Sequence, residues 1–351
     1  MLNKQRDWSL DFLRILSSLL VIMIHTAMYG WYDTSPRTYT WTVLNFYDTL
    51  ARPAVPIFFM ISGSLLLRKD KIDIKKLWLK NIAHLGVIYF VWVVFYAVTN
   101  IGVKKALADP RLIWDTVFGP NPQYHLWFLR TLICLYAIAP LLQVLVRSMD
   151  GKLFRYFFAI FFVFGLLRKT VLEMPFTPAW LHNQIVLFED MELVEFSAYF
   201  MLGYFLSQPD AAQRFPKRTL WVVYVVTLLL AAGLNQLIAV IDNWPTQAFY
   251  GNFSIPVAVE ASCLFLLFRK YFSEVFFSPR TAQLIVRISK STLFVYLVHV
   301  FVIQRLQMYL HFYTTDYNVL FSVPLMVILV FVLSVLVGII LERIPILNRI
   351  L

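Results

Sequence analysis

Two ionisable residues, Arg14 and His25, lie in the first apolar run of the chain, at about residues 10–29. A charged side chain at the centre of a membrane helix costs about 2.5–3.5 kcal/mol, so embedded ionisable residues usually serve a function. In an α-helix their eleven-residue spacing makes about three turns, which places both side chains on one face about 16 Å apart. An imidazole accepts and returns protons near neutral pH. The pair therefore indicates a proton-transfer site, with a snorkelling arginine and a packing histidine as the structural alternatives.

The composition is typical of a polytopic membrane protein. The 351 residues are 60% hydrophobic and 15% charged, with a mean hydropathy of +0.69, which lies outside the range of soluble domains. The net charge of +11 would suit a nucleic-acid-binding protein, but no basic soluble face or motif accompanies it, and no nucleic-acid partner is expected. Cys134 and Cys263 fall in apolar runs and are interpreted as small hydrophobic residues. No cleavable signal, metal site or tightly bound cofactor is expected.

Ten apolar stretches predict an all-α polytopic membrane protein, with a bundle of about ten transmembrane helices. We expect a single domain, residues 1–351, without a soluble domain. The fifth and sixth stretches are shorter than the roughly 20 residues that a perpendicular span requires, so they must include flanking residues. The stretches are 10–29, 43–67, 77–98, 126–146, 153–167, 193–206, 220–241, 253–268, 291–307 and 319–341.

Basic residues are distributed unevenly among the segments that connect these stretches. Most of the 31 Lys and Arg residues fall in the two terminal segments and in every second connection between helices. Cytoplasmic segments carry an excess of Lys and Arg, so both termini are predicted to be cytoplasmic. The basic residues that lie inside apolar runs instead are Arg14, Arg52, Arg130 and Arg305.

The second apolar stretch carries its own helix-breaking signal. It reads Arg52-Pro53-Ala54-Val55-Pro56 near its start, and two prolines directly after an arginine predict a broken or kinked helix. Such a break is expected to leave a cavity near Arg52. The structural alternative is that Ser62-Gly63-Ser64 forms a small-residue face that packs against a neighbouring helix.

Further ionisable residues lie within or beside the later stretches. His125, Trp127 and Arg130 stand at the outer start of the fourth stretch, where an aromatic belt also places tryptophan. The other embedded groups are Glu195, Glu260 and His299. Each is interpreted as part of a site or as half of an ion pair, since intramembrane charges pair across helices. The partners considered are Arg52, Arg130 and Arg305.

Five short blocks of the sequence carry a family resemblance. They are the Asp11-x-x-Arg14 start, the Arg14-x10-His25 spacing, Val55-Pro56-Ile57-Phe58-Phe59-Met60-Ile61-Ser62-Gly63, Tyr124-His125-Leu126-Trp127-Phe128-Leu129 with Leu135-Tyr136 and Pro140-Leu141, and Ile288-Ser289-Lys290-Ser291-Thr292-Leu293-Phe294-Val295-Tyr296-Leu297-Val298-His299. In their order and separation they resemble the membrane-bound acyltransferase family 3. Within that family the chain looks most like the compact members that O-acetylate enterobacterial common antigen.

The resemblance implies a multi-pass protein of the bacterial cytoplasmic (inner) membrane that acts as an O-acyltransferase. It implies transfer of an acyl group, usually acetyl, from cytoplasmic acetyl-CoA to a hydroxyl of an extracytoplasmic surface glycan or its lipid-linked precursor. Acetyl-CoA is then a co-substrate, and catalysis is assigned to His25 and Arg14.

The orientation given by the basic residues, with the positions of the candidates along their helices, sorts the remaining candidates by side of the membrane. The donor would be bound by Arg14 with Arg68, Lys69 and Lys71, where family members often carry an Arg-x-Arg pair. The residues expected on the acceptor side of the site or around it are Arg52, His125, Trp127, Arg130, Glu195, Glu260 and His299.

Two questions stay open at the level of sequence. His25 either deprotonates the acceptor hydroxyl or first takes the acyl group itself. The alternative class is a transporter or flippase for a lipid-linked saccharide, because kinked helices and midplane charges also mark secondary transport. An inverted repeat would favour that class, and none is recognised in the sequence. A pH sensor built on an embedded histidine has only His25 in its support.

Overall fold

The computed structural model describes residues 6–119, 123–174, 177–186, 192–272, 275 and 277–341. These residues form helices and connecting segments and contain no strand, which confirms the all-α expectation. They divide into two compact units. Unit 1 comprises residues 6–65 and 149–339, and unit 2 comprises residues 66–148 with residues 340 and 341.

Seven helical segments of the described chain are long and apolar enough to cross a membrane. They are Trp8–Ala27, Tyr39–Leu66, Ile74–Ile101, Tyr124–Ser148, Lys217–Asp242, Pro279–Leu310 and Val319–Ile340. All ten expected stretches coincide with helices, but the count of about ten spans is not confirmed. Three of the stretches fall short because their helices are shorter or more highly charged. They correspond to α9, η3 and α10 (Gly151–Ile160, Phe161–Leu167 and Arg168–Leu172), to α12 (Glu192–Leu206) and to α14 (Ile255–Phe272).

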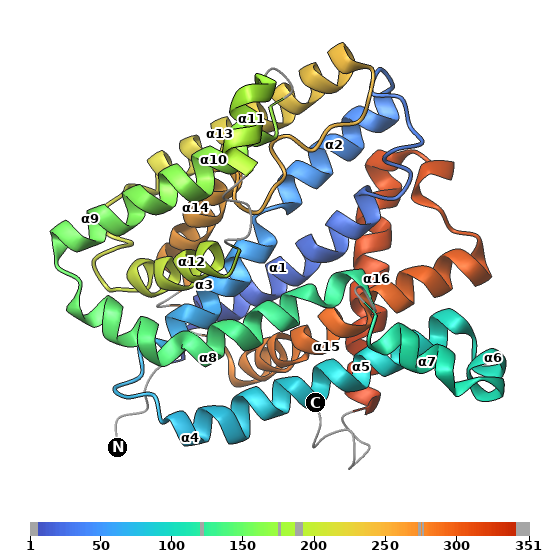
Figure 1. Ribbon diagram of the computed structural model, residues 1–351, viewed down its shortest axis with the longest axis horizontal. Coiled ribbons are helices and arrows are strands. Elements are labelled where there is room, and N and C mark those ends of the chain that lie inside the picture. The colour runs from blue at the N-terminus through green and yellow to red at the C-terminus, as the bar shows by residue number, and fades with distance from the viewer. Residues whose placement is uncertain are drawn as a thin grey trace. The chain divides into compact units, whose positions relative to one another are not determined.

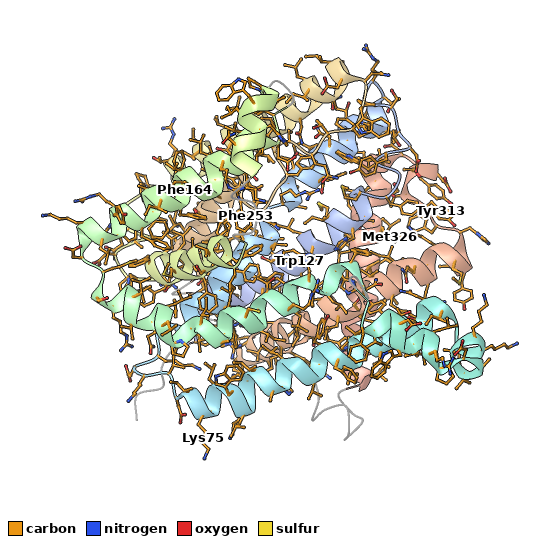
Figure 2. All side chains as sticks on the ribbon, in the orientation of Figure 1. Lys75, Trp127, Phe164, Phe253, Tyr313 and Met326 are labelled. Carbon is orange, nitrogen blue, oxygen red and sulfur yellow. The ribbon has the colours of Figure 1, made fainter. Side chains whose placement is uncertain are left out.

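Helix α1 (Trp8–Ala27) lies at the centre of unit 1, where it contacts α2 (Tyr39–Ala51), α14 and α15 (Pro279–Leu310), as Figure 1 shows. It begins where the Asp7 carboxylate accepts a hydrogen bond from the backbone N–H of Ser9 (3.2 Å), because helix N-termini leave such donors without intrahelical partners. Leu13 and Ile22 are fully buried on its packed side. α13 (Lys217–Asp242) packs against both α2 and α14. Side chains fill the spaces between these ribbons, Phe253 among them (Figure 2).

The expected break in the second stretch is confirmed. α2 ends at Ala51, Arg52 caps it, and α3 (Ala54–Leu66) begins after Pro53. Proline has no backbone N–H, so the helical ladder cannot continue through this point. Small side chains on both sides of the break pack against α1 in an apolar cluster of Leu20, Val21, Ala51 and Ala54. The break therefore places Arg52 beside α1.

Helices α3 and α12 cross with their backbones in contact at two glycines. A Cβ atom on Gly63 would lie 1.8 Å from the carbonyl oxygen of Phe200, and one on Gly203 would lie 1.9 Å from that of Met60. Small residues allow helix backbones to approach this closely in membranes. The interpretation of Gly63 as a packing residue is thereby confirmed, because any larger side chain would separate the two helices.

Gly63→Ala is expected to lower the stability of unit 1 by about 1–3 kcal/mol, since overpacking displaces backbone rather than a flexible side chain. Thermal unfolding of the purified protein in detergent measures the change. Gly233→Ala is the matched control, because no heavy atom lies within 4 Å of a Cβ built at that helical position. Alanine is also the better helix former, by about 1 kcal/mol. Equal melting temperatures for Gly63→Ala and the wild type would contradict the crossing.

The remaining elements of unit 1 connect or flank these helices. They are α11 (Ala179–Val186), η4 (Thr314–Asp316) and α16 (Val319–Leu341), whose last residues belong to unit 2. α15 ends at His311, which adopts the left-handed conformation with a φ of 50°.

Unit 2 is built on two long helical segments, each of which combines α-helix with a second helical form. The first runs through α4 (Ile74–Lys76), the π-helical η1 (Leu77–Ile82) and α5 (Ala83–Ile101). The second runs through η2 (Tyr124–Leu126) and α8 (Trp127–Ser148). The short helices α6 (Val103–Ala108) and α7 (Pro110–Val117) connect them.

Candidate functional site

The structure brings two histidines of distant sequence position together. His25 on α1 and His299 on α15 have ring centroids 5.1 Å apart, with an interplanar angle of 32°. His299 is fully buried, whereas His25 is half-buried. Nδ1 of His299 lies 2.7 Å from the carbonyl oxygen of Tyr296. A carbonyl oxygen can only accept, so Nδ1 carries the proton and the ring nitrogen Nε2 of the neutral form carries the lone pair.

Arg52 lies beside the end of α1 that carries His25. Its Nη2 donates to Oδ2 of Asp48 (2.5 Å) and to Sδ of Met28 (3.5 Å), which stands one helical turn beyond His25. The guanidinium carbon lies 4.6 Å from the ring centroid of Tyr250. Of the sequence-predicted residues, His25, His299 and Arg52 thus form one cluster in unit 1.

Arg14 occupies the other end of the same helix and stands in a charged cluster. Its Nη1 lies 3.7 Å from Oδ1 of Asp11. Asp11 also accepts two hydrogen bonds from Arg6 (2.6 and 2.8 Å) and one from the Ser289 hydroxyl (2.6 Å). The bidentate bond to Asp11 raises the pKa of Arg6 above its ordinary value. Arg14 itself keeps 29% of its side chain exposed, so this end of α1 presents a cation whose position is set by a buried carboxylate.

Glu195 has a partner that the sequence analysis did not consider. Arg168 Nη2 donates to Glu195 Oε1 at 2.6 Å, and the exposed fractions of the two side chains are only 5% and 4%. The expected pairing of Glu195 with Arg52, Arg130 or Arg305 is therefore wrong. Arg168 was assigned to a connecting segment, and its apolar surroundings become evident only once η3 and α12 pack together.

Glu260 and Arg305 do not form the ion pair that was considered for them. Glu260 on α14 is fully buried, and neither carboxylate oxygen has a hydrogen-bond partner among the residues that the structure describes. Arg305 instead places its guanidinium carbon 4.6 Å from the ring centroid of Phe301. Both residues belong to unit 1.

The fourth-stretch candidates belong to unit 2. His125 is buried in η2 and packs edge-on against Tyr96, with ring centroids 5.0 Å apart. Trp127, at the start of α8 (Figure 2), is half-buried, whereas Arg130 is exposed. His125 therefore lies in an aromatic environment within its own unit.

The basic segment before α4, residues 67–72, is held in place by hydrogen bonds to its main-chain atoms. Gln143 of α8 donates to the carbonyl oxygen of Lys69 at 2.7 Å and accepts from the N–H of Ile72 at 3.1 Å. Arg147 donates to the carbonyl oxygens of Asp70 (2.5 Å) and Lys69. The basic side chains of this segment, Arg68, Lys69 and Lys71, are exposed, and so is that of Asp70. They belong to unit 2, whereas Arg14 belongs to unit 1.

Sequence reasoning missed the supporting roles of three residues. Asp11 holds Arg14, whereas Asp48 and Tyr250 hold Arg52. Asp48 had a readable signal, because it stands four residues before Arg52 in an apolar stretch and that spacing puts the two side chains on one helix face. Tyr250 had no such signal, since a tyrosine in a loop is common. Among the described residues, no group of three or more His, Cys, Asp and Glu side chains could hold a metal ion.

An embedded imidazole beside a held guanidinium can move a proton and stabilise a negative charge. A sequence profile of the acyltransferase domain of acyltransferase family 3 matches residues 7–343. The chain therefore belongs to acyltransferase family 3, and its long apolar helices are those of a multi-pass membrane protein.

One curated relative covers only part of the chain. An amino-acid racemase of Enterococcus faecalis is 32% identical over 143 residues, which are 39% of this chain and 19% of the racemase. The chain thus spans about a fifth of the length of that relative, whose name describes the relative alone. No solved structure gives a significant match.

Proposed function

We propose that the protein is an O-acetyltransferase of the bacterial cytoplasmic membrane. It moves an acetyl group from cytoplasmic acetyl-CoA to a hydroxyl of an extracytoplasmic surface glycan or of its lipid-linked precursor, such as enterobacterial common antigen. Both termini lie on the cytoplasmic side in this proposal, because most basic residues fall in segments on that side. The membership in acyltransferase family 3 supports the reaction class.

The observation that carries this proposal is the half-buried His25 beside the buried His299, with ring centroids 5.1 Å apart. In direct transfer, a ring nitrogen of His25 takes the proton of the acceptor hydroxyl while the oxygen attacks the thioester carbonyl. The tetrahedral intermediate then expels the CoA thiolate, which takes that proton back from the imidazolium. In the covalent route, a ring nitrogen of His25 attacks the thioester, the C–S bond breaks and the CoA thiolate leaves. The acceptor hydroxyl then attacks the acetyl-histidine, the C–N bond breaks, and the released ring nitrogen takes the proton of the hydroxyl.

The donor reaches this site along α1 from the end that carries Arg14. The guanidinium of Arg14, with 29% of its side chain exposed, provides a cation for the phosphates of CoA. In unit 2, the exposed Arg68, Lys69 and Lys71 are assigned to the donor by the family resemblance alone. Arg14 and His25 are about three turns, or about 16 Å, apart on one helix. The acetyl group therefore travels deep into the bundle while the nucleotide part of CoA stays at its mouth.

The test is turnover of labelled acetyl-CoA by the purified protein in proteoliposomes, with methyl glycosides of glucose, galactose and N-acetylglucosamine as acceptor probes. We expect release of CoA and an acetylated glycoside or, with water as the acceptor, acetate. His84→Gln serves as a control for the loss of an unrelated histidine, and it is expected to match the wild type. A protein that moves a lipid-linked saccharide across the bilayer and consumes no acetyl-CoA would instead be a flippase.

Trapping with labelled acetyl-CoA in the absence of glycoside separates the two chemical routes. A labelled protein whose label disappears in His25→Gln supports the acetyl-histidine intermediate. An unlabelled protein with full turnover supports direct transfer.

A further inference from the structure

Arg52 is a constrained cation of unit 1, at the point where α2 ends. Its Nη2 donates to Asp48 (2.5 Å), whose side chain is fully buried, and its guanidinium carbon lies 4.6 Å from the ring centroid of Tyr250. A carboxylate at one edge and an aromatic face beneath fix both the position and the plane of a guanidinium. Arg52 itself is 15% exposed, so its charge sits in a largely apolar setting.

The support beneath Arg52 is itself held from two helices. The Tyr250 hydroxyl donates to the side-chain oxygen of Asn45 on α2, and Asn45 Nδ2 donates to the carbonyl oxygen of Ala232 on α13 (2.9 Å). Burial raises the pKa of Tyr250 above its ordinary value, so the ring stays neutral beneath the cation. The guanidinium is therefore preorganised by α2, α13 and the segment that follows α13.

One buried donor of Arg52 and one buried acceptor of Asp48 make no hydrogen bond to the described residues. Within the described part of the chain, the buried Nε of Arg52 has no acceptor and the buried Oδ1 of Asp48 has no donor. Leaving a buried polar group without a partner costs about 1–3 kcal/mol, and more for a charged group. An N–H donor without an acceptor, on a guanidinium that is fixed in place, is suited to bind an oxygen atom that gains negative charge.

Arg52, with Asp48 and Tyr250, lies near His25, where the proposed reaction forms such an oxygen. Arg52 Nη2 lies 3.5 Å from Sδ of Met28, one turn beyond His25 on the same helix, and the preceding Ala51 packs against Leu20 and Val21 of α1. Attack on a thioester places negative charge on the carbonyl oxygen, next to the group that accepts the proton. The Nδ1–H of His299 is occupied by the carbonyl oxygen of Tyr296 (2.7 Å), so that donor is not directed at the oxyanion. Arg52 is the guanidinium available to that oxygen by these contacts.

We propose that the Nε–H of Arg52 binds and stabilises the tetrahedral oxyanion formed at His25, with Asp48 as the residue that positions it. The inference rests on the proposed function. When the acceptor oxygen attacks, the carbonyl π electrons move to oxygen, and Arg52 donates a hydrogen bond to that oxyanion. When the carbonyl re-forms, the C–S bond breaks and the CoA thiolate takes the proton held by His25. Arg52 keeps its own protons throughout.

The test compares Arg52→Gln and Arg52→Lys in the acetyl-CoA turnover assay with methyl glycosides. Removing one oxyanion donor costs about 10²–10³ in kcat in other acyl-transfer sites. We expect that loss for Arg52→Gln, with the KM for acetyl-CoA within about twofold of the wild type. Arg52→Lys keeps the charge that pairs with Asp48 but lacks the directed Nε–H, so it is expected to fold and still to lose at least tenfold in kcat. Arg305→Gln is the matched control, since its guanidinium lies against Phe301.

Asp48→Asn tests the positioning role separately. It is expected to lower kcat less than Arg52→Gln, and the double variant is expected to be no worse than Arg52→Gln alone. A wild-type kcat in a folded Arg52→Lys, or a loss confined to KM, would overturn the inference while leaving the proposed function intact. A wild-type protein that turns over no acetyl-CoA would refute the proposed function itself.

Discussion

His25→Gln is expected to lower acetyl transfer by about 10²–10⁴-fold, which is the usual contribution of a positioned general acid–base group, and to leave donor binding unchanged. Glutamine fills similar space but cannot take a proton from a hydroxyl. His25 is half-buried, so its replacement leaves the packed side of α1, with Leu13 and Ile22, in place. The measurement is kcat for CoA release in proteoliposomes, beside the affinity for a thioether analogue of acetyl-CoA by calorimetry.

Arg14→Gln is the matched variant on the same helix, and it is expected to behave in the opposite way. Its partly exposed guanidinium lies at the donor end, so its loss should raise the KM for acetyl-CoA more than it lowers kcat. Equal loss of analogue binding in both variants would contradict the division of roles along α1. Normal turnover by His25→Gln would remove His25 from the mechanism.

Glu195→Ala is expected to lower the free energy of unfolding by about 3–5 kcal/mol, because it leaves the charge of Arg168 buried without its partner. The two groups meet at 2.6 Å and are almost completely buried. Arg168 Nε also donates to the carbonyl oxygen of Phe164 in the π-helical η3 (2.6 Å), which ties the charge to that turn. Chemical unfolding of the protein in mixed micelles, followed by tryptophan fluorescence, gives the difference.

The double variant Arg168→Met/Glu195→Leu separates the cost of an orphaned charge from the worth of the pair. Apolar replacements of buried ion pairs are often neutral or stabilising, so it should be more stable than Glu195→Ala. A double variant as unstable as the single one would mean that the packing of these side chains, and not the charge, is what unit 1 requires.

The positions of the helices could be predicted from the sequence because apolar runs and prolines act locally. Each apolar stretch coincides with a helix, and the Arg52-Pro53 break occurs where proline removes a ladder hydrogen bond. The number of spans could not be predicted equally well. α14 is apolar but carries Glu260 and two basic residues, so composition alone does not decide whether it crosses a membrane.

The partners within the candidate site were harder to predict, because periodicity shows which face of a helix is special but not which helix faces it. His25 and His299 meet only because α1 packs on α15. Glu195 takes Arg168 rather than a midplane arginine for the same reason. Asp48 and Arg52 are the exception, since their contact lies within one helical turn and could have been derived from the spacing.

The loop before α4 has a consequence for how such proteins diversify. Gln143 and Arg147 form hydrogen bonds with main-chain atoms of residues 67–72. The side chains of Arg68, Lys69 and Lys71 take no part in these bonds. Main-chain atoms are common to all amino acids, so the loop can keep its course while its charges are exchanged. Natural variation at these positions, or a designed Arg-x-Arg swap, can therefore retune the recognition of a charged ligand without a structural cost to the helices that carry the loop.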